Sequence, residues 1–271
     1  MWHNLGQLVR YRGLIQSLVA RELKARYRGS VLGFFWSFVN PLLLLSVYSF
    51  VFVVVLPGLH SQDIEPYSLF MFCGLLPWTW FSSSLLESTN SLIAGGNLIK
   101  KVLFPAEVLP IVSVLANMVH FLLGLPILAA FMVYFGRYPD APGLGWFAVV
   151  VLVQLIFTLG LGLLLSALTV HYRDLKELLG NVLTLWFFST PILYSMIEVT
   201  KPGQGGVGLT KRVLDLNPMT HVVVTYQEIL FHHGPVGHAK WLLWTGAGAI
   251  LVFVAGYWVF DRLRDSFAEA V

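Results

Sequence analysis

The sequence predicts an all-α integral membrane protein with six transmembrane helices. Of its 271 residues, 57% are hydrophobic and only 11% are Asp, Glu, Lys or Arg, whereas soluble domains carry about 25% charged residues. The mean hydropathy is +0.75. Charge-free runs recur along the chain, and their lengths are close to the roughly 20 residues that a helix needs to cross the hydrocarbon core. These observations exclude a disordered chain and argue against an ordinary soluble domain.

The predicted spans follow the charge-free runs. Because every backbone N–H and C=O must be paired inside a bilayer, runs of this length are expected to be helices. The short alternating blocks of an outer-membrane barrel are absent. The spans are expected at 31–56, 68–87, 107–135, 146–169, 178–197 and 241–260. Together they form a transmembrane domain over 31–260, preceded by an N-terminal arm (1–30) and followed by a tail (261–271).

The distribution of basic residues predicts the orientation. Most of the 17 Lys and Arg lie in the arm, in the connections after spans 2 and 4, and in the tail. Cytoplasmic segments are enriched in Lys and Arg, so both termini are expected in the cytoplasm. A cleavable signal peptide is not expected, because the first apolar run begins only after the charged arm.

The arm has the pattern of an amphipathic helix when it is stepped at about 100° per residue. One side carries Arg10, Ser17, Arg21, Lys24 and Arg28, and the opposite side carries Leu8, Tyr11, Ile15, Leu18 and Val19. Glu22 and Arg26 have the i,i+4 spacing of an ion pair. Such a helix lies in the headgroup plane. Two roles remain open: a basic anchor that only fixes the topology, or an interfacial helix that also contacts a cytoplasmic partner.

The connection between spans 2 and 3 predicts a second short helix. Gly95 and Gly96 should end span 2. Asn97 is a candidate N-cap for a helix that Pro105 terminates. This helix would expose Leu98, Ile99, Val102 and Leu103 beside Lys100 and Lys101. It could rest on lipid headgroups or dock into a socket on another protein.

The outer segment 198–240 is long for a plain loop. A short helix is expected at 211–216. Asn217 then provides a cap and Pro218 a first-turn proline for a second helix that runs through Tyr226. This helix is too short to span the membrane, and such lengths are typical of re-entrant segments. We therefore expect an outer gate, with an amphipathic helix on the outer leaflet as the alternative.

The spans carry little chemistry of their own. Glu87 and Glu107 lie at span ends, and His120, inside span 3, is expected to be packed and hydrogen-bonded. Ion-driven carriers usually keep ionisable groups within their helices. No P-loop, hydrolase motif or metal-ligand spacing is found, and a net charge of +3 does not favour nucleic acid. The chain is thus not expected to be an enzyme or to hold a cofactor, and any ATP and Mg²⁺ should bind another polypeptide.

Aromatic residues make up 14% of the chain. Span 1 places several on one stripe and span 5 adds others: Phe34, Phe38, Tyr48, Phe52, Trp186 and Tyr194. Pro41 lies within the stripe and can kink the helix. These rings could pack against lipid and other helices, or they could line a channel along which sugar rings slide.

Five segments occur in order along nearly the whole chain. They are Arg21–Gly33 with Trp36 and Asn40-Pro41-Leu42; Gly74–Trp78 with Phe81; Lys100-Lys101-Val102 through Phe104-Pro105 with Glu107; Tyr172–Lys176; and Asn217-Pro218-Met219. Together they resemble the permease subunits of ABC-type polysaccharide exporters, which transport O-antigen, capsule or teichoic acid.

This resemblance implies a half-transporter in a bacterial cytoplasmic (inner) membrane. Two copies would pair with two ATP-binding subunits, amid membrane lipids, and export a lipid-linked polysaccharide. It implies docking on the ATPase through Leu98, Ile99, Lys100, Lys101, Val102 and Phe104, and an interface helix carrying Arg21, Glu22, Lys24, Arg26 and Arg28. The 211–230 helices would guard the exit. An ABC exporter of drugs or lipids, and a membrane enzyme acting on lipid-linked sugars, are the alternatives.

Overall fold

The computed structural model of the chain describes residues 11–55, 64–101, 105–139, 141–196, 207–232 and 236–270. Within these ranges the regular elements are all helices. They are α2 (Arg12–Arg26), the 3₁₀ helix η1 (Gly33–Phe35), α3 (Trp36–Ser49), the π-helix η2 (Phe50–Val55), α4 (Tyr67–Ala94), α5 (Gly96–Lys101), α6 (Val108–Tyr134), α7 (Ala141–His171), α8 (Leu175–Phe188), α10 (Val207–Leu216), α11 (Pro218–Leu230) and α12 (Ala239–Ala270).

Five of the described helical segments are long and apolar enough to cross a membrane. They are Gly33–Val55, Tyr67–Ala94, Val108–Tyr134, Gly143–His171 and Ala239–Phe267. Each overlaps one of the ranges predicted from the sequence. The all-helical membrane fold is therefore confirmed.

Three of these helices extend beyond their predicted ends, α7 by a few residues at each end and two others by more. The second was expected to stop at residue 87, but α4 continues to Ala94. Its polar residues do not break it, because Thr89 donates its hydroxyl to the carbonyl of Leu85 within the same helix. Gly95 ends it. The residues predicted as a tail continue α12 as far as Ala270.

The predicted span at 178–197 is not one continuous helix. α8 begins earlier, at Leu175, and ends at Phe188. Its 14 residues rise about 1.5 Å each, which is less than the roughly 30 Å of the hydrocarbon core. Pro191 explains the end, because it lacks an N–H and disfavours helical conformation in the residue before it.

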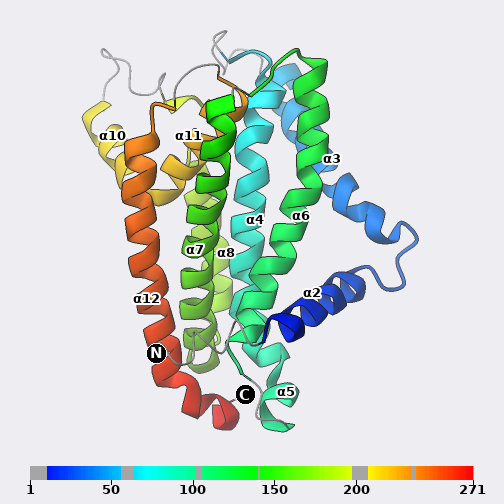
Figure 1. Cartoon of the computed structure of the whole chain (residues 1–271), viewed down its shortest axis with the longest axis vertical. Coiled ribbons are helices and arrows are strands. Elements are labelled where there is room, and N and C mark those ends of the chain that lie inside the picture. Colours follow the sequence, from blue (N-terminus) through cyan, green and yellow to red (C-terminus); the bar gives the residue numbers. More distant parts are fainter. Residues whose placement is uncertain are drawn as a thin grey trace.

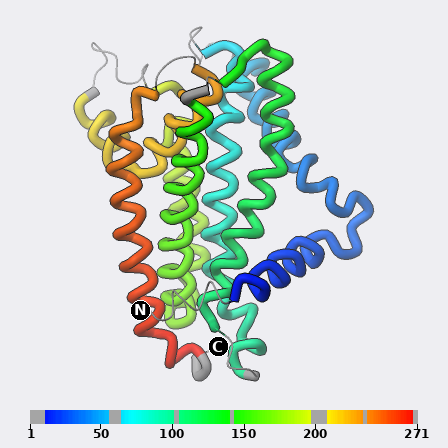
Figure 2. The backbone as a smooth tube through the Cα atoms, in the orientation of Figure 1, coloured from blue at the N-terminus to red at the C-terminus, as the bar shows by residue number. Residues whose placement is uncertain are grey.

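The long helices α4, α6, α7 and α12 stand side by side with α8 (Figure 1). α4 is the central element, and most of its side chains are buried. α3 stands apart from the others over much of its length, and only Ser37 and Leu45 are buried along it. α2 runs obliquely to the upright helices (Figure 2), and it packs mainly on α6.

α7 and α12 form the closest helix pair. A Cβ added to Gly256 would overlap the carbonyl oxygen of Gly160, and one added to Gly160 would lie 2.6 Å from the Cα of Phe253. Small residues allow such close approach of helices in membrane proteins. The pair therefore depends on glycine at both positions.

α5 and the last turns of α12 lie at the same end of the bundle, and α2 lies in the half nearest to them (Figure 1). A hydrophobic cluster joins the first two: Ile99 of α5 packs against a group that includes Phe260 and Phe267 of α12. Arg264 of α12 lies 3.8 Å from the buried carboxylate of Glu107. We call this end of the molecule the α5 end; here α5 and the start of α6 are joined to the last turns of α12.

Candidate functional site

The α2 helix is held on the bundle by its apolar side. Leu18 is buried with Val108 and Val112 of α6, while Ile15 and Val19 pack at the edge of this cluster. The apolar side predicted for the arm is therefore correct at these positions. Arg21 and Lys24 are exposed on α2. Arg28 is also exposed but lies beyond the helix, which ends at Arg26.

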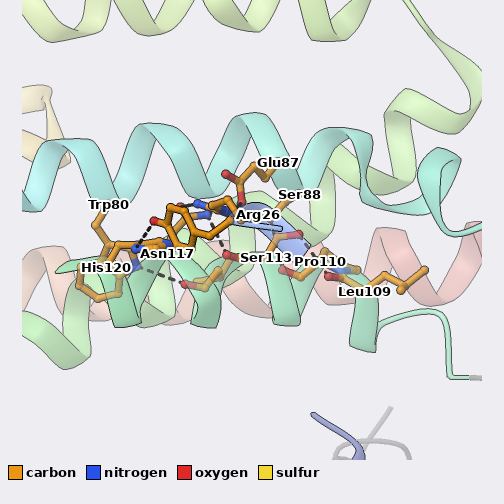
Figure 3. Close-up of polar contacts among 11 residues, drawn as sticks. Arg26, Trp80, Glu87, Ser88, Leu109, Pro110, Ser113, Asn117 and His120 are labelled. Carbon is orange, nitrogen blue, oxygen red and sulfur yellow. Dashed lines mark hydrogen bonds and ion pairs between the residues drawn. The ribbon is translucent and has the colours of Figure 1, made fainter. Parts of the chain in front are cut away.

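Arg26 turns inward and joins three helices. Its Nη2 donates to Oε2 of Glu87 in α4 at 2.6 Å, and its Nη1 donates to Oδ1 of Asn117 in α6 at 3.2 Å. The amide of Asn117 donates in turn to Glu87 at 2.6 Å and to the carbonyl of Ser113. Figure 3 shows these side chains converging between α4 and α6. The predicted partner of Arg26 was Glu22; the structure pairs it with Glu87, because the end of α2 faces the bundle.

A cavity of about 590 Å³ adjoins this network, between α2, α3, α4 and α6. Its lining includes Arg26, Trp36, Asn40, Ser83, Asn117 and His120. Tyr27 accepts a hydrogen bond from Ser37 (2.9 Å), and its hydroxyl lies 3.4 Å from Nδ1 of His120. The expected packing of His120 is therefore confirmed. The aromatic residues selected from the sequence do not line this cavity.

The short helix α5 begins at Gly96, so Asn97 lies within it and not at its N-cap. Leu98 lines a hollow of about 430 Å³ that separates α5 from Arg21 and Glu22 of α2. Ile99, predicted to be exposed, packs inward and is half-buried. Lys100 is exposed. The side chain of Lys101 and the residues Val102 and Phe104 lie outside the described part of the structure.

The predicted aromatic stripe separates into two groups. Phe34 and Phe38 contact each other edge to face at 5.9 Å between ring centroids. Tyr48 and Phe52 stack at 6.4 Å, and Tyr48 reaches Phe187 of α8 at 5.9 Å. The turn of α3 at Pro41 lies between the two groups.

The two aromatic residues chosen in the fifth span differ in their surroundings. Trp186 packs on Trp78 and Phe81 of α4. Tyr194 lies past the end of α8 and donates its hydroxyl to the carbonyl of Phe188 at 3.3 Å. Trp186 thus packs α8 against α4, and Tyr194 bonds to the C-terminal end of α8.

Asn217 is the N-cap of α11, as predicted. Its Oδ1 accepts from the backbone N–H of Met219 at 3.0 Å and from Nε1 of Trp186 at 2.7 Å. Its amide donates to the carbonyl of Ser189 and to the hydroxyl of Thr190. Pro218 occupies the first turn. One side chain thus joins the start of α11 to the end of α8.

α11 is enclosed by the bundle. Tyr226 is fully buried between the rings of Phe121 and Phe147, and burial raises its pKa. His221 stacks on Trp241 at 5.0 Å, and burial lowers the pKa of this imidazole. This enclosure contradicts the alternative of a helix resting on the outer leaflet. α10, in contrast, exposes Leu209 and Leu216.

Sequence reasoning missed the residues that connect these elements. Glu87 was identified only as the end of a span, and Asn117 was not singled out. The sequence pattern that could have identified Asn117 is a polar side chain inside a charge-free run, because such a group needs a partner within the membrane. Among the described residues, no cluster could hold a metal ion.

The fold is that of a helical membrane protein, with α5 at one end of the bundle and α10 and α11 towards the other. Residues 13–231 match the family described as ABC-2 type transporter. The chain belongs to this family, and its predicted identity as an ABC transporter membrane subunit, not a catalytic enzyme, is confirmed.

The chain is also similar to curated proteins over its full length. An O-antigen export system permease protein RfbA of Myxococcus xanthus is 40% identical over 98% of both chains. Two proteins of the same name from Klebsiella pneumoniae are 33% and 32% identical over 99% of this chain and 98% of theirs.

Proposed function

We propose that this protein is the membrane subunit of an ATP-driven exporter of a lipid-linked polysaccharide in a bacterial cytoplasmic membrane. The observation that carries the proposal is the 40% identity to an O-antigen export permease over 98% of both chains. Similarity of this extent favours a glycan over the drug or lipid cargo of other ABC exporters. It also favours transport over an enzyme acting on lipid-linked sugars.

The proposed assembly contains two copies of this chain and two ATP-binding subunits. ATP and Mg²⁺ would bind the partner, in keeping with the lack of a P-loop in the sequence. α8 would complete a sixth crossing together with the residues that follow it. The basic residues of the arm, connections and tail support cytoplasmic termini. The position of α2, α5 and the end of α12 in the same half of the molecule is consistent with this orientation.

The α5 end provides a surface for the ATPase. Leu98 of α5 and Arg21 and Glu22 of α2 line the same hollow of about 430 Å³, and Lys100 is exposed on α5. A groove between two short helices suits a protruding element of a partner. Ile99 links α5 to α12, so a push on α5 would reach the long helices directly.

The opposite end would release the polymer. α11 is short, buried and held to α8 through Asn217, which is the arrangement expected of a re-entrant gate. Tyr48 of α3 contacts Phe187 of α8, and Phe52 of η2 stacks on Tyr48 and lies against Tyr67 of α4. Tyr48 and Phe52 are the best candidates for a channel lining between two copies, because both α3 and α8 expose apolar side chains.

The proposal is tested in cells that lack the chain. We expect lipid-linked glycan to accumulate at the inner leaflet and the wild-type chain to restore its export. Replacing Tyr48 and Phe52 with Ala should reduce export while co-purification of the ATPase is unchanged. Failure of the wild-type chain to restore export in the presence of its ATPase would overturn the proposed function.

A further inference from the structure

The cavity between α2, α3, α4 and α6 is separate from α5, the proposed ATPase contact, and from α11, the proposed gate. Several polar side chains line the cavity, although the helices α3, α4 and α6 around it are apolar enough to span a membrane. Its volume is about 590 Å³, within the range of roughly 300–1,000 Å³ that is typical of small-molecule sites. It is therefore large enough for a short saccharide and too small for a polymer.

Three polar groups in the lining have unused hydrogen-bonding capacity. Within the described ranges, neither the amide of Asn40 nor the hydroxyl of Ser83 has a protein partner, and the same is true of the buried Nε2 of His120. Because Ser37 donates to Tyr27, the Tyr27 hydroxyl is free to donate to Nδ1 of His120. In the tautomer that accepts this hydrogen bond at Nδ1, Nε2 carries the ring hydrogen and is a donor. Asn40 is exposed and Ser83 half-buried, whereas Nε2 of His120 is buried without a partner, which is unfavourable in apolar surroundings. A polar molecule in the cavity would pair with all three groups.

The charge and the shape of the cavity restrict what that molecule is. Among the described residues of the lining, Arg26 is the only Lys or Arg, and its guanidinium is already paired with Glu87 at 2.6 Å. Phosphate groups are bound most strongly by cations that are free to pair with them. Trp36 and Trp80 use their N–H groups on Ser30 and on the carbonyl of Val114, which leaves the indoles as apolar walls. Apolar walls with neutral donors and acceptors favour a neutral, hydroxyl-rich ring.

We infer that this cavity binds a neutral sugar residue of the lipid-linked substrate on the side of the molecule that carries α2. The inference rests on the proposed function and makes it more specific. Asn40 and Ser83 supply hydrogen bonds to the sugar, His120 supplies a donor, and Arg26 and Glu87 keep the site neutral. The site is separate from the aromatic surface of Tyr48 and Phe52.

The test measures binding to the complete transporter, with its ATPase, in lipid nanodiscs. One probe is a short-chain prenyl diphosphate that carries one N-acetylhexosamine, and the other is the same prenyl diphosphate without sugar. Two net hydrogen bonds are expected to make the sugar-bearing probe bind about tenfold more tightly. The double variant Asn40→Ala/Ser83→Ala should lose this difference. It should still fold, because neither side chain has a partner in the described structure to lose.

The matched control is Ser46→Ala/Ser82→Ala, on the same two helices but outside the cavity lining, and it should keep the preference for the sugar. The inference is overturned if the wild-type complex binds both probes equally, or if the double variant keeps the difference. Either result, obtained with a complex that still exports glycan in cells, leaves the proposed function in place. Loss of export by the wild-type chain would instead remove the proposed function.

Discussion

Arg26 in α2 and Glu87 in α4 form an ion pair of 2.6 Å between residues that are 61 positions apart in the chain. The pair fixes an oblique surface helix to the central helix of the bundle. Asn117 contacts both charges from α6. A force applied to α2 would therefore reach two membrane-spanning helices through three side chains.

We expect Arg26→Ala to destabilise the protein by on the order of 1–2 kcal/mol. The side chains of Arg26 and Glu87 are 26% and 35% exposed, so the cost lies between those of surface and buried pairs. The measurement is thermal unfolding of the detergent-solubilised protein. Arg28→Ala is the control, because Arg28 is exposed and has no ion pair in the described structure. Equal unfolding temperatures for the two variants would contradict the role of the pair.

Reversing the charges of Lys100 and Lys101 to Glu should reduce the substrate-stimulated ATP hydrolysis of the complex. Both residues belong to α5, the helix proposed to dock on the ATPase, and docked charges are sensitive to sign. The same reversal at Lys211 and Arg212, which are exposed on α10 at the other end, should leave hydrolysis unchanged. Normal stimulation in the α5 variant would argue against docking there.

Asn217→Ala should loosen the contact between α8 and α11. The variant loses the helix cap, which contributes about 1 kcal/mol, and leaves Nε1 of Trp186 without its acceptor. Asn217→Asp keeps an acceptor for both donors and should be milder in that respect. Thermal unfolding and leakage of a small saccharide from vesicles measure the effect. Val213→Ala on the exposed side of α10 is the control. A lower unfolding temperature for Asn217→Asp than for Asn217→Ala would contradict the capping argument.

Gly256→Ala should lower the yield of folded protein, because its Cβ would overlap the carbonyl oxygen of Gly160. Overpacking typically costs about 1–3 kcal/mol. Gly248→Ala on the same helix meets nothing within 4 Å and should be neutral or stabilising by about 0.5–1 kcal/mol. Size-exclusion profiles and unfolding temperatures compare the two. If both variants behave alike, the close contact of α7 and α12 does not limit packing.

The sequence predicted the helical ranges well wherever hydrophobicity alone decides them. It predicted the cap at Asn217 and the apolar side of α2 because these are local patterns. It could not predict that Arg26 pairs with Glu87 instead of Glu22, since that choice depends on how α2 crosses the bundle. Nor could it predict that Ile99 faces inward, because α5 is too short to show a period. The cavity is lined by residues of α2, α3, α4 and α6, so no local sequence pattern could predict it.

Phe267→Ala should uncouple ATP hydrolysis from export. Phe267 is fully buried and contacts Phe260 at 5.1 Å, in the cluster that also receives Ile99 of α5. Removing the ring would leave a void where α5 meets α12, so a push on α5 would be absorbed locally. α12 also contacts α11 at its other end, through the stacking of Trp241 on His221. We therefore expect ATP hydrolysis to continue while export falls, measured on the same reconstituted complex.

The control is Asp265→Ala, two residues away and exposed, which should leave the ratio of export to hydrolysis unchanged. A parallel loss of both activities in the Phe267 variant would mean that the cluster supports folding and not the transmission of movement.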